Sequence, residues 1–377
     1  MRMRISVIVC VFFLVRVCSL RFLKMSAKGI KVTTYNVLSS SLARSDYFTF
    51  CNPKWLSSTY RLKKLKEKMD LEVSKKSIIC LQEVSMVWAG ALHGYFASRG
   101  YQFITGLYGG KFNGYMGVAV AVPLSEYDIL DADITRIADT KTVARKDKKK
   151  GNIFSMLKNI FFWPVVRFLR SLGIVKEREK LPWDVSLDRF NQMVSVRLLP
   201  KDIDVGASKN AFVVGTYHMP CIFRTPQVMM IHCALSAQHI HKYAAGSPYV
   251  YCGDFNIKPD SPMYSMLTQG KVDESIPEYP TKLDDEDSWK PDVVPLKSAY
   301  KEFLGKEPEY TNNAHIKNEE PFIETLDYIF TSSEHPWKVQ EVEPLDVKHP
   351  AKASVTEPLP SENEPSDHIL LSSTFTL

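Results

Sequence analysis

Short apolar runs bounded by turn residues recur along the chain, and such runs are typical of buried β-strands. We expect strands at 30–35, 77–81, 116–122, 192–198, 211–217, 249–253, 326–330 and 368–374. Longer stretches with a helical pattern lie between them, at 61–74, 88–98, 225–244 and 261–269. Several strands follow one another too closely for crossover helices, which disfavours one doubly wound parallel sheet. The pattern predicts an α/β fold, a four-layer α/β sandwich of two stacked mixed β-sheets flanked by helices.

Three segments depart from this alternation. Residues 271–295 and 341–364 are rich in proline and acidic residues and predict surface loops. Residues 141–180 begin with a basic run and continue with large apolar residues mixed with cations, and Pro164 should break or kink any helix there. We expect a basic amphipathic insertion that lies on an anionic membrane surface or, alternatively, packs on its own domain and exposes its charges. Its lysines could also contact nucleic-acid phosphates without reading sequence.

Composition and charge agree with a globular domain that buries a sizeable core. The chain has 377 residues, of which 45% are hydrophobic, and a formal net charge of +6. That charge is local, because residues 1–24 carry +5 and residues 141–180 carry +9, which leaves −8 on the remainder. Attraction to polyanions is therefore expected at the insertion and around bound metal. The seven cysteines lack the spacing of a disulfide framework or a zinc site.

Residues 1–24 predict a leader, either a signal peptide or a membrane anchor. Two arginines precede an apolar run at 5–15, which is too short to span a bilayer comfortably. The alternative is a dispensable extension, because Arg16 follows the run closely and Met25 offers a second start. Localisation stays open between the secretory pathway or a membrane and, with a start at Met25, the cytoplasm. The catalytic domain is expected at 29–377 in either case.

Asp254 and Asn256 are the strongest chemical signal, directly after the apolar run 249–253. The two-residue period of a strand places both side chains on one face at the strand's end. An acid and an amide placed in this way can hold a water or a phosphoryl oxygen, and can bind a hard divalent cation through oxygen. By itself, however, Asp-x-Asn at a strand end is also a common turn.

Other predicted strands also end in polar residues. Asn36, Glu83 and His218 each stand at the end of an apolar run. Asp327 lies among apolar neighbours, and a buried carboxylate needs a partner. His368, at the start of the next strand, is the natural one, because an acid that holds an imidazole in one tautomer makes it a general base. Each residue alone could be a capped strand or a core polar group, but together they predict a catalytic centre.

The order of these residues resembles the endonuclease/exonuclease/phosphatase superfamily, which includes deoxyribonuclease I, over about 29–377 without the insertion. The motifs that carry this resemblance are Gln82-Glu83, Gly253-Asp-Phe-Asn256, Leu326-Asp-Tyr-Ile-Phe and Ser366-Asp-His368. Pro259-Asp-Ser-Pro-Met-Tyr264, Ser298-Ala-Tyr300 and Tyr310-Thr-Asn are similar to one branch of it. That branch contains the poly(A) deadenylases related to carbon catabolite repressor nuclease, nocturnin and Angel.

This resemblance implies a cofactor and a place for it. The expected cofactor is Mg²⁺, with Mn²⁺ as an alternative ion. Glu83 would be the principal metal ligand, with Asn36 and Asp367 nearby. Asp254 would position or deprotonate the attacking water, and Asn256 would help to orient the water and the scissile phosphate.

The resemblance also implies roles for the two histidines and one aromatic ring. His218 would donate to a phosphate oxygen. Asp327 would orient His368, which would contact the phosphate and serve in acid/base transfer. Asn36 would also contact substrate. Phe322 lies where deadenylases stack a base, although it could equally be a loop residue tucked into the core.

The implied activity is that of a magnesium-dependent phosphodiesterase, a 3′-5′ exoribonuclease of the deadenylase type acting on RNA. The alternatives are a lipid phosphodiesterase, such as a sphingomyelinase, or a nucleotide or inositol phosphatase on the same fold. A non-catalytic scaffold is disfavoured because every expected catalytic residue is present. One departure, His218-Met-Pro-Cys-Ile-Phe-Arg224, lacks the usual aromatic and proline spacing, so a preference for poly(A) does not follow. We expect a monomer without a leucine-rich repeat docking module.

Overall fold

The computed structural model describes residues 29–141, 181–201, 210–280, 291–335, 337–345 and 357–376. The predicted leader and all of the predicted insertion except Lys141 lie outside the described residues, so both stay predictions. Among the helices that are described, none is both long and apolar enough to cross a membrane.

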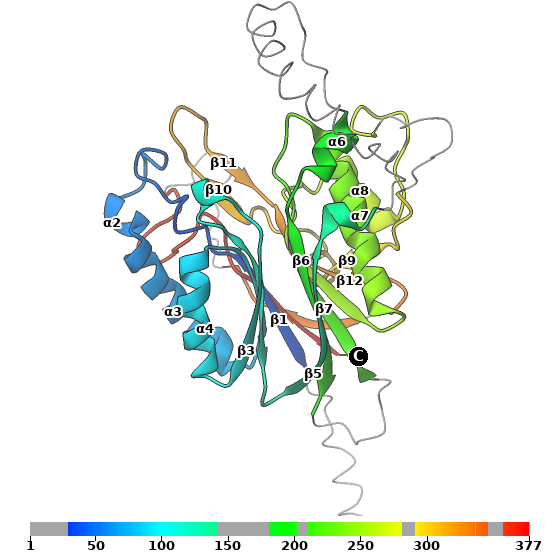
Figure 1. Ribbon diagram of the computed structural model, residues 1–377, viewed down its shortest axis with the longest axis horizontal. Helices are drawn as coiled ribbons and strands as arrows, with labels where there is room; N and C mark the ends of the chain where they lie inside the picture. Colours follow the sequence, from blue (N-terminus) through cyan, green and yellow to red (C-terminus); the bar gives the residue numbers. More distant parts are fainter. Residues whose placement is uncertain are drawn as a thin grey trace, which may run out of the picture.

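Two six-stranded mixed sheets form the centre of the molecule (Figure 1). The first sheet has the order β13 (Lys338–Val342), β14 (Leu371–Thr376), β1 (Ile30–Asn36), β2 (Ile78–Val84), β4 (Gly117–Pro123) and β3 (Tyr101–Leu107). The second has the order β5 (Tyr127–Arg136), β6 (Gln192–Pro200), β7 (Phe212–His218), β8 (Tyr249–Asp254), β12 (Asp327–Ser332) and β9 (Leu296–Ser298). The pairs β1–β2 and β7–β8 are parallel, and the other neighbours are antiparallel.

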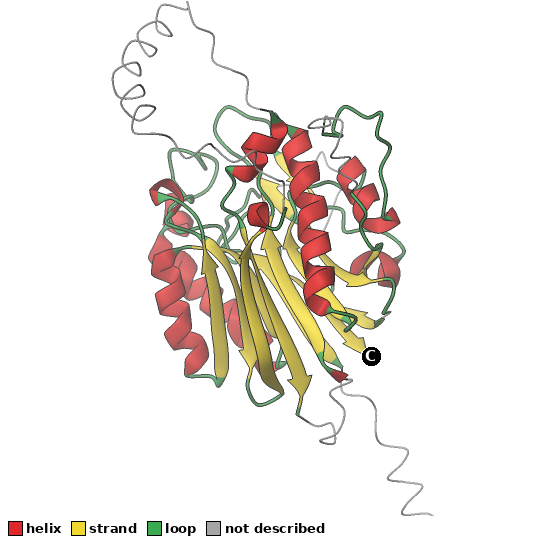
Figure 2. Ribbon diagram, turned by 45° about the vertical axis from the view of Figure 1, so that its right-hand side comes forward, coloured by secondary structure: helices red, strands yellow, loops and turns green. Residues whose placement is uncertain are grey.

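Helices cover the outer faces of both sheets, as Figure 2 shows. On the first sheet these are α3 (Ser58–Ser74) and α4 (Met86–Ala97). On the second they are α6 (Pro182–Leu187), α7 (Pro226–Ala244) and α8 (Pro262–Gln269). Smaller elements are α2 (Pro53–Leu56), η1 (Lys111–Asn113), η2 (Ile137–Asp139), α9 (Ala299–Leu304) and the ribbon of β10 (Asn312–Ala314) with β11 (Phe322–Glu324). The predicted four-layer sandwich is confirmed.

The central strands of this sandwich are apolar on both faces. In β2, Ile78 and Cys80 belong to the core between the two sheets, whereas Ile79 and Leu81 belong to the core under α3 and α4. Side chains alternate along a strand with a period of two, so a strand covered on both sides has apolar residues at every position. This is why the central strands could be predicted as unbroken apolar runs.

Strands at the sheet edges differ from the prediction. The long edge strand β5 was not predicted, because Tyr127 is its only buried residue and it contains no continuous apolar run. The last strand begins at Leu371 and not at residue 368, and His368 instead forms an isolated bridge with Asn312. The described parts of the predicted loop at 271–295 contain neither helix nor strand.

Candidate active site

The polar residues at the strand ends meet at one edge of the sandwich. Asn36 closes β1, and Glu83 lies near the end of the parallel strand β2. His218 and Asp254 close the parallel strands β7 and β8 and are direct neighbours in register. Asp327 opens β12 opposite Asp254. Parallel strands end at the same edge of a sheet, so the chain delivers these groups to one place from five strands.

A pocket of about 930 Å³ opens at this edge. Most of the predicted site residues line it: Glu83, His218, Asp254, Asn256, Phe322, Asp367 and His368. Asn36 and Asp327 lie beneath, fully or almost fully buried, and contact residues of the lining. The structure therefore brings together all of the residues singled out from the sequence.

Asp254 lies on the floor of the pocket, where several polar side chains approach it, and it is 2% exposed. Asn36 Nδ2 donates to its Oδ2 at 2.9 Å, and the backbone N–H of Asn256 donates to its Oδ1 at 2.9 Å. The Nε2 atoms of His218 and His368 lie 3.6 and 3.7 Å from Oδ2. One carboxylate is thus fixed by two donors and faces two imidazoles.

Asn256 reaches the pocket by a different geometry from the one expected. Strand β8 ends at Asp254, and Asn256 has a left-handed backbone with φ of 52°, so strand periodicity does not set its direction. Its Nδ2 donates to the carbonyl of Met219 at 2.9 Å. Both Asp254 and Asn256 line the pocket, but through a turn and not through one strand face.

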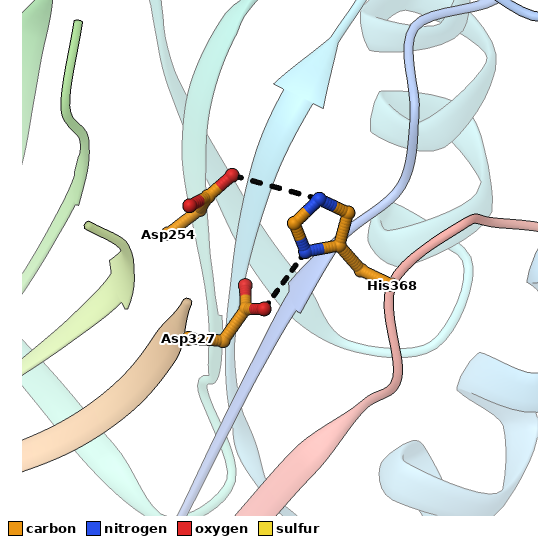
Figure 3. A group of neighbouring side chains, drawn as sticks. All are labelled: Asp254, Asp327 and His368. Carbon is orange, nitrogen blue, oxygen red and sulfur yellow. Dashed lines mark hydrogen bonds and ion pairs between the residues drawn. The ribbon is translucent and has the colours of Figure 1, made fainter. Parts of the chain in front are cut away.

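Asp327 and His368 are in direct contact, as Figure 3 shows, with 2.7 Å between His368 Nδ1 and Asp327 Oδ2. Thr311 Oγ1 donates to the same carboxylate oxygen at 2.6 Å and accepts from the backbone N–H groups of Leu326 and Asp327. These contacts place a hydrogen on Nδ1 of His368, and its Nε2 faces Asp254.

Burial and charge act in opposite directions on this pair. Burial lowers the pKa of His368, but the carboxylates of Asp327 and Asp254 outweigh it and raise that pKa well above its ordinary value. Burial raises the pKa of Asp327 to about 6, although His368 opposes that change. At neutral pH the pair is therefore an imidazolium and a carboxylate.

Glu83 is aimed into the pocket by a bulge in β2. The pairing of β2 with β4 shifts register between Leu81 and Val84, and Glu83 has φ of 59°. Such a bulge turns a side chain away from its regular direction. Glu83 Oε2 accepts from the N–H of Ser39 at 2.9 Å, while Oε1 lies 3.3 Å from Asn36 Nδ2.

This neighbourhood fits a hard divalent cation. Such ions prefer carboxylate and amide oxygens, which Glu83, Asp367 and Asn36 provide. Burial raises the pKa of Asp367, His368 lowers it, and the charge of Glu83 raises it further. A cation near Glu83 and Asp367 would relieve that repulsion. Asp254, Asp327 and His368 also offer ligand atoms within 4.8 Å of one another, but Asp327 and His368 already bond to each other.

Phe322 lies on the pocket wall and is half-buried. Its ring centroid is 6.4 Å from that of Phe223, with 46° between the ring planes. Lys258 Nζ lies 5.7 Å from the Phe322 centroid and also forms an ion pair with Glu324 at 2.8 Å. The ring is therefore available to a bound molecule, as a stacking role requires.

Several supporting polar residues were missed at the sequence level. Thr311 and Asn312 belong to a motif that had been noticed without a role, and Asn312 Nδ2 donates to the Asp367 carbonyl at 3.3 Å. Asn191 Nδ2 donates to the His218 carbonyl at 2.8 Å. These partners are far apart in sequence and leave no local pattern, so only the fold reveals them.

Comparisons with known proteins agree on the family. The model of the Endonuclease/Exonuclease/phosphatase family matches residues 33–368. The chain is 26% identical over 381 residues to carbon catabolite repressor protein 4 homolog 2 of Arabidopsis thaliana, covering 93% of this chain and 58% of that protein. It is 25% identical over 357 residues to 2′,5′-phosphodiesterase 12 of Homo sapiens, covering 91% and 51%. The chain spans about half the length of these curated relatives.

Solved structures show the same fold. The crystal structure of ANGEL2, described as a 2′,3′-cyclic phosphatase, in complex with adenosine-2′,3′-vanadate aligns with a TM-score of 0.66 at 22% identity, covering 92% of this chain and 95% of that one. The human Nocturnin catalytic domain aligns with a TM-score of 0.56 at 18% identity, covering 92% and 93%. The resemblance to the deadenylase branch and the fold predicted from the sequence are both confirmed.

Proposed function

The chain belongs to the endonuclease/exonuclease/phosphatase family, and from this premise we propose that it is a magnesium-dependent 3′-5′ exoribonuclease of the deadenylase type. The observation that carries the proposal is the pocket floor, where Asp254 faces the imidazoles of His218 and His368 beside the carboxylate of Glu83. Water attack on a phosphodiester needs a base, donors to the phosphate oxygens and positive charge, and this floor offers all three.

Asp254 is the residue that holds the attacking water and accepts its proton. The amide of Asn36 and the N–H of Asn256 keep its carboxylate in place. Asn256 is itself held by the Met219 carbonyl, so it contributes to orienting the water and the scissile phosphate.

The two histidines act on the phosphate. Asp327 holds His368 as an imidazolium whose Nε2–H donates to a phosphate oxygen and then serves in acid/base transfer. His218 donates to a second phosphate oxygen, and the contact of Asn191 with its carbonyl fixes the end of β7. Charge that develops at phosphorus is thus met by donors that are already in position.

The proposed metal position is at Glu83, with Asp367 and Asn36 nearby. Bound there, Mg²⁺, or Mn²⁺ in its place, would supply positive charge against the non-bridging phosphate oxygens. Phe322 is proposed to stack the base next to the scissile phosphate.

The names of the relatives support RNA as substrate and also define the alternative. A protein of Aspergillus niger that is 27% identical over 368 residues is described as a CCR4-Not complex 3′-5′-exoribonuclease subunit. Other relatives carry the name 2′,5′-phosphodiesterase 12. The alternative linkage is therefore 2′,5′, and it has to be compared directly with 3′,5′.

The test is hydrolysis of 5′-labelled RNA by the purified full-length chain, with magnesium or with chelator. Substrates are a 3′,5′-oligoadenylate, a mixed-sequence RNA and a 2′,5′-oligoadenylate, and Asp254→Asn is the control variant. A magnesium-dependent ladder shortening from the 3′ end, absent in the control, is the expected result. Cleavage of the 2′,5′ substrate alone would mean that the enzyme hydrolyses 2′,5′ linkages and not the proposed 3′,5′ linkages. Cleavage of none of the three would refute an RNA substrate.

A further inference from the structure

Exposed phenylalanines gather at the rim of this pocket. Among the described residues, five phenylalanines are exposed, and three of them line the pocket: Phe112 at 78%, Phe190 at 62% and Phe223 at 54% exposure. Phe223 packs near Phe322, the ring already proposed to stack a base. Phe112 and Phe190 have no role in the chemistry described above, and exposed apolar side chains that gather in a patch mark ligand-binding grooves.

These two rings lie on the other side of the reaction centre from Phe322. Phe112 belongs to the turn between β3 and β4, and Phe190 shortly precedes β6, which pairs with the end of β7. In the second sheet, the order β6-β7-β8-β12 puts His218 and Asp254 between β6 and β12. Phe322 is carried by β11, just before β12. The pocket therefore has an aromatic ring on each side of Asp254.

The turn that carries Phe112 is tied to the proposed metal site. Ser39 Oγ donates to the carbonyl of Asn113 at 2.7 Å, and the N–H of the same serine donates to Glu83 at 2.9 Å. Gly114, with φ of 68°, allows the tight turn, because a Cβ there would lie 2.6 Å from Ser41 Oγ. The exposed ring thus projects from a braced turn.

Phe190 is braced in the same way against the catalytic histidine. The guanidinium of Arg136 lies 4.6 Å from its ring centroid, and Arg136 Nε donates to the Arg189 carbonyl at 2.8 Å. The next residue, Asn191, donates to the His218 carbonyl. The Phe190 ring is thus held in place by the Arg136 cation and by its neighbours' contacts with the strand that carries His218. A ring held in this way can stack on a flat ligand.

Polar groups around the two rings identify the ligand as a nucleotide. Lys111 precedes Phe112, and Arg189 precedes Phe190, so each ring has a cation beside it in the chain. A base stacks on a ring, and a phosphate pairs with a cation.

We propose that Phe112 and Phe190 form a second base-stacking subsite, so that the pocket binds a nucleotide on each side of the scissile phosphate. The inference rests on the proposed nuclease function and makes it more specific. The preferred substrate is then a single strand with an internucleotide phosphodiester, not a terminal phosphate monoester.

The first test is direct binding, which needs no turnover. Fluorescence anisotropy of a labelled single-stranded oligoadenylate in chelator would be compared for the wild-type chain, Phe112→Ala, Phe190→Ala and Phe303→Ala. Phe303 is also exposed but lies on α9 outside the pocket, and its variant should bind like wild type. Each pocket variant should weaken binding about 5- to 50-fold, and Phe112→Trp should restore it.

The second test is kinetic. With magnesium, KM for RNAs of increasing length should rise more in the Phe112→Ala/Phe190→Ala double variant than KM for bis(p-nitrophenyl) phosphate, which has no base. An equal loss on both substrates would mean that the rings only support the loops, and would overturn the subsite. So would unchanged oligonucleotide binding combined with weaker binding to phosphatidylserine vesicles, which would make the rim a membrane contact. If oligonucleotides bind through the rings but wild type cleaves none, the nuclease function fails and the subsite stands.

Discussion

At the scale of single residues, Asp254 has a crowded and well-defined environment. Its two carboxylate oxygens accept from Asn36 and from the backbone of Asn256, and two imidazoles face one of them. A carboxylate held in this way loses little freedom when it takes up a water molecule. In the proposed mechanism its negative charge is needed for proton transfer, whereas its shape is needed only for packing.

Asp254→Asn should therefore strongly reduce turnover and keep the fold. The amide has the same shape but does not accept a proton, so kcat on RNA should fall about 10²- to 10⁴-fold. Circular dichroism and the melting temperature should stay close to wild type. Asp260→Asn, at an exposed carboxylate shortly after the same strand, is the matched control and should retain activity. Retained turnover in Asp254→Asn would remove this residue from the mechanism.

Thr311 supports the pair of Asp327 and His368 through its hydrogen bond to Asp327, and substitution of Thr311 tests that support. Thr311→Val keeps the size of the side chain but leaves the N–H groups of Leu326 and Asp327 and one oxygen of Asp327 without their shared partner. Unfolding free energy should fall by about 1–3 kcal/mol, and kcat should fall more than KM changes. Thr311→Ser keeps the hydroxyl and should recover both quantities. Equal behaviour of the two variants in denaturant titration and kinetics would contradict this role.

The residues that meet at the pocket could be singled out from the sequence, but the residues that support them could not. Asn36, Glu83 and His218 are recognisable because each polar residue follows an apolar run where burial would otherwise be expected. Thr311 and Asn191 act through partners brought together by the fold, and hydrogen bonds between distant segments have no periodicity to detect. The direction of Asn256 was assigned from strand geometry, but its left-handed backbone sets it instead.

At the scale of elements, the close approach of β7 and β8 aligns the site. Gly253 has φ of 145°, and a Cβ at this position would lie 2.0 Å from the carbonyl oxygen of Tyr217. Only glycine allows that contact. The next pair in register is His218 with Asp254, so the spacing of these strands sets the spacing of the two groups that face each other in the candidate site.

Gly253→Ala should therefore destabilise the fold by more than about 3 kcal/mol. The added methyl group meets backbone and not a flexible side chain, so β8 has to shift. Gly94→Ala in α4 is the control, because a Cβ there meets nothing within 4 Å and the change should stabilise the helix by about 0.5–1 kcal/mol. Chemical denaturation measures both, and a neutral Gly253→Ala would show that the strands can separate freely.

The packing of α7 on β7 and α6 predicts a pH dependence of stability. Burial lowers the pKa of His232 to about 4, and the neutral ring bridges the hydroxyl of Tyr217 and the carbonyl of Ser186. Between an unfolded pKa of about 6.5 and the folded value, the unfolded chain binds more protons. Stability from this group is therefore complete above about pH 6.5 and is lost as the pH falls toward 4.

His232→Gln should flatten the loss of unfolding free energy between pH 6.5 and 4, which amounts to about 3 kcal/mol for this group. Denaturant titrations across that pH range, compared with His93→Gln at an exposed position, provide the measurement. If unfolding free energy falls with pH equally steeply in His232→Gln and wild type, another group causes the pH dependence.

Central elements were predictable and edge elements were not. Strands β2, β7 and β8 are covered on both faces and appear in the sequence as apolar runs. Strand β5 borders solvent and carries three aspartates, and β10 and β11 are only three residues each. Their pairing depends on neighbours already in place, which a local pattern does not contain.

At the scale of the whole molecule, the site joins the two sheets. Glu83 comes from the first sheet and Asp254 from the second, and Asn36 bonds to both. Because the carboxylates approach one another only in the folded state, a cation bound among them favours folding.

Magnesium should therefore raise the melting temperature of the full chain. At a concentration 100 times Kd, the expected stabilisation is about 2.7 kcal/mol. Glu83→Gln should remove most of this shift, whereas Glu302→Gln, at an exposed helix position, should keep it. Differential scanning fluorimetry with and without chelator gives the comparison. An equal rise in melting temperature in both variants would mean that the metal binds away from Glu83.

Strand β14, near the C-terminal end of the chain, lies between β13 and β1 in the first sheet. During synthesis on the ribosome, β1 emerges early but has to wait for residues 371–376 before one of its two neighbours exists. His368 and Asp367 arrive at the same late moment. A chain interrupted before these residues thus lacks both a neighbour of β1 and His368, so the first sheet and the candidate site are completed in the same step of synthesis.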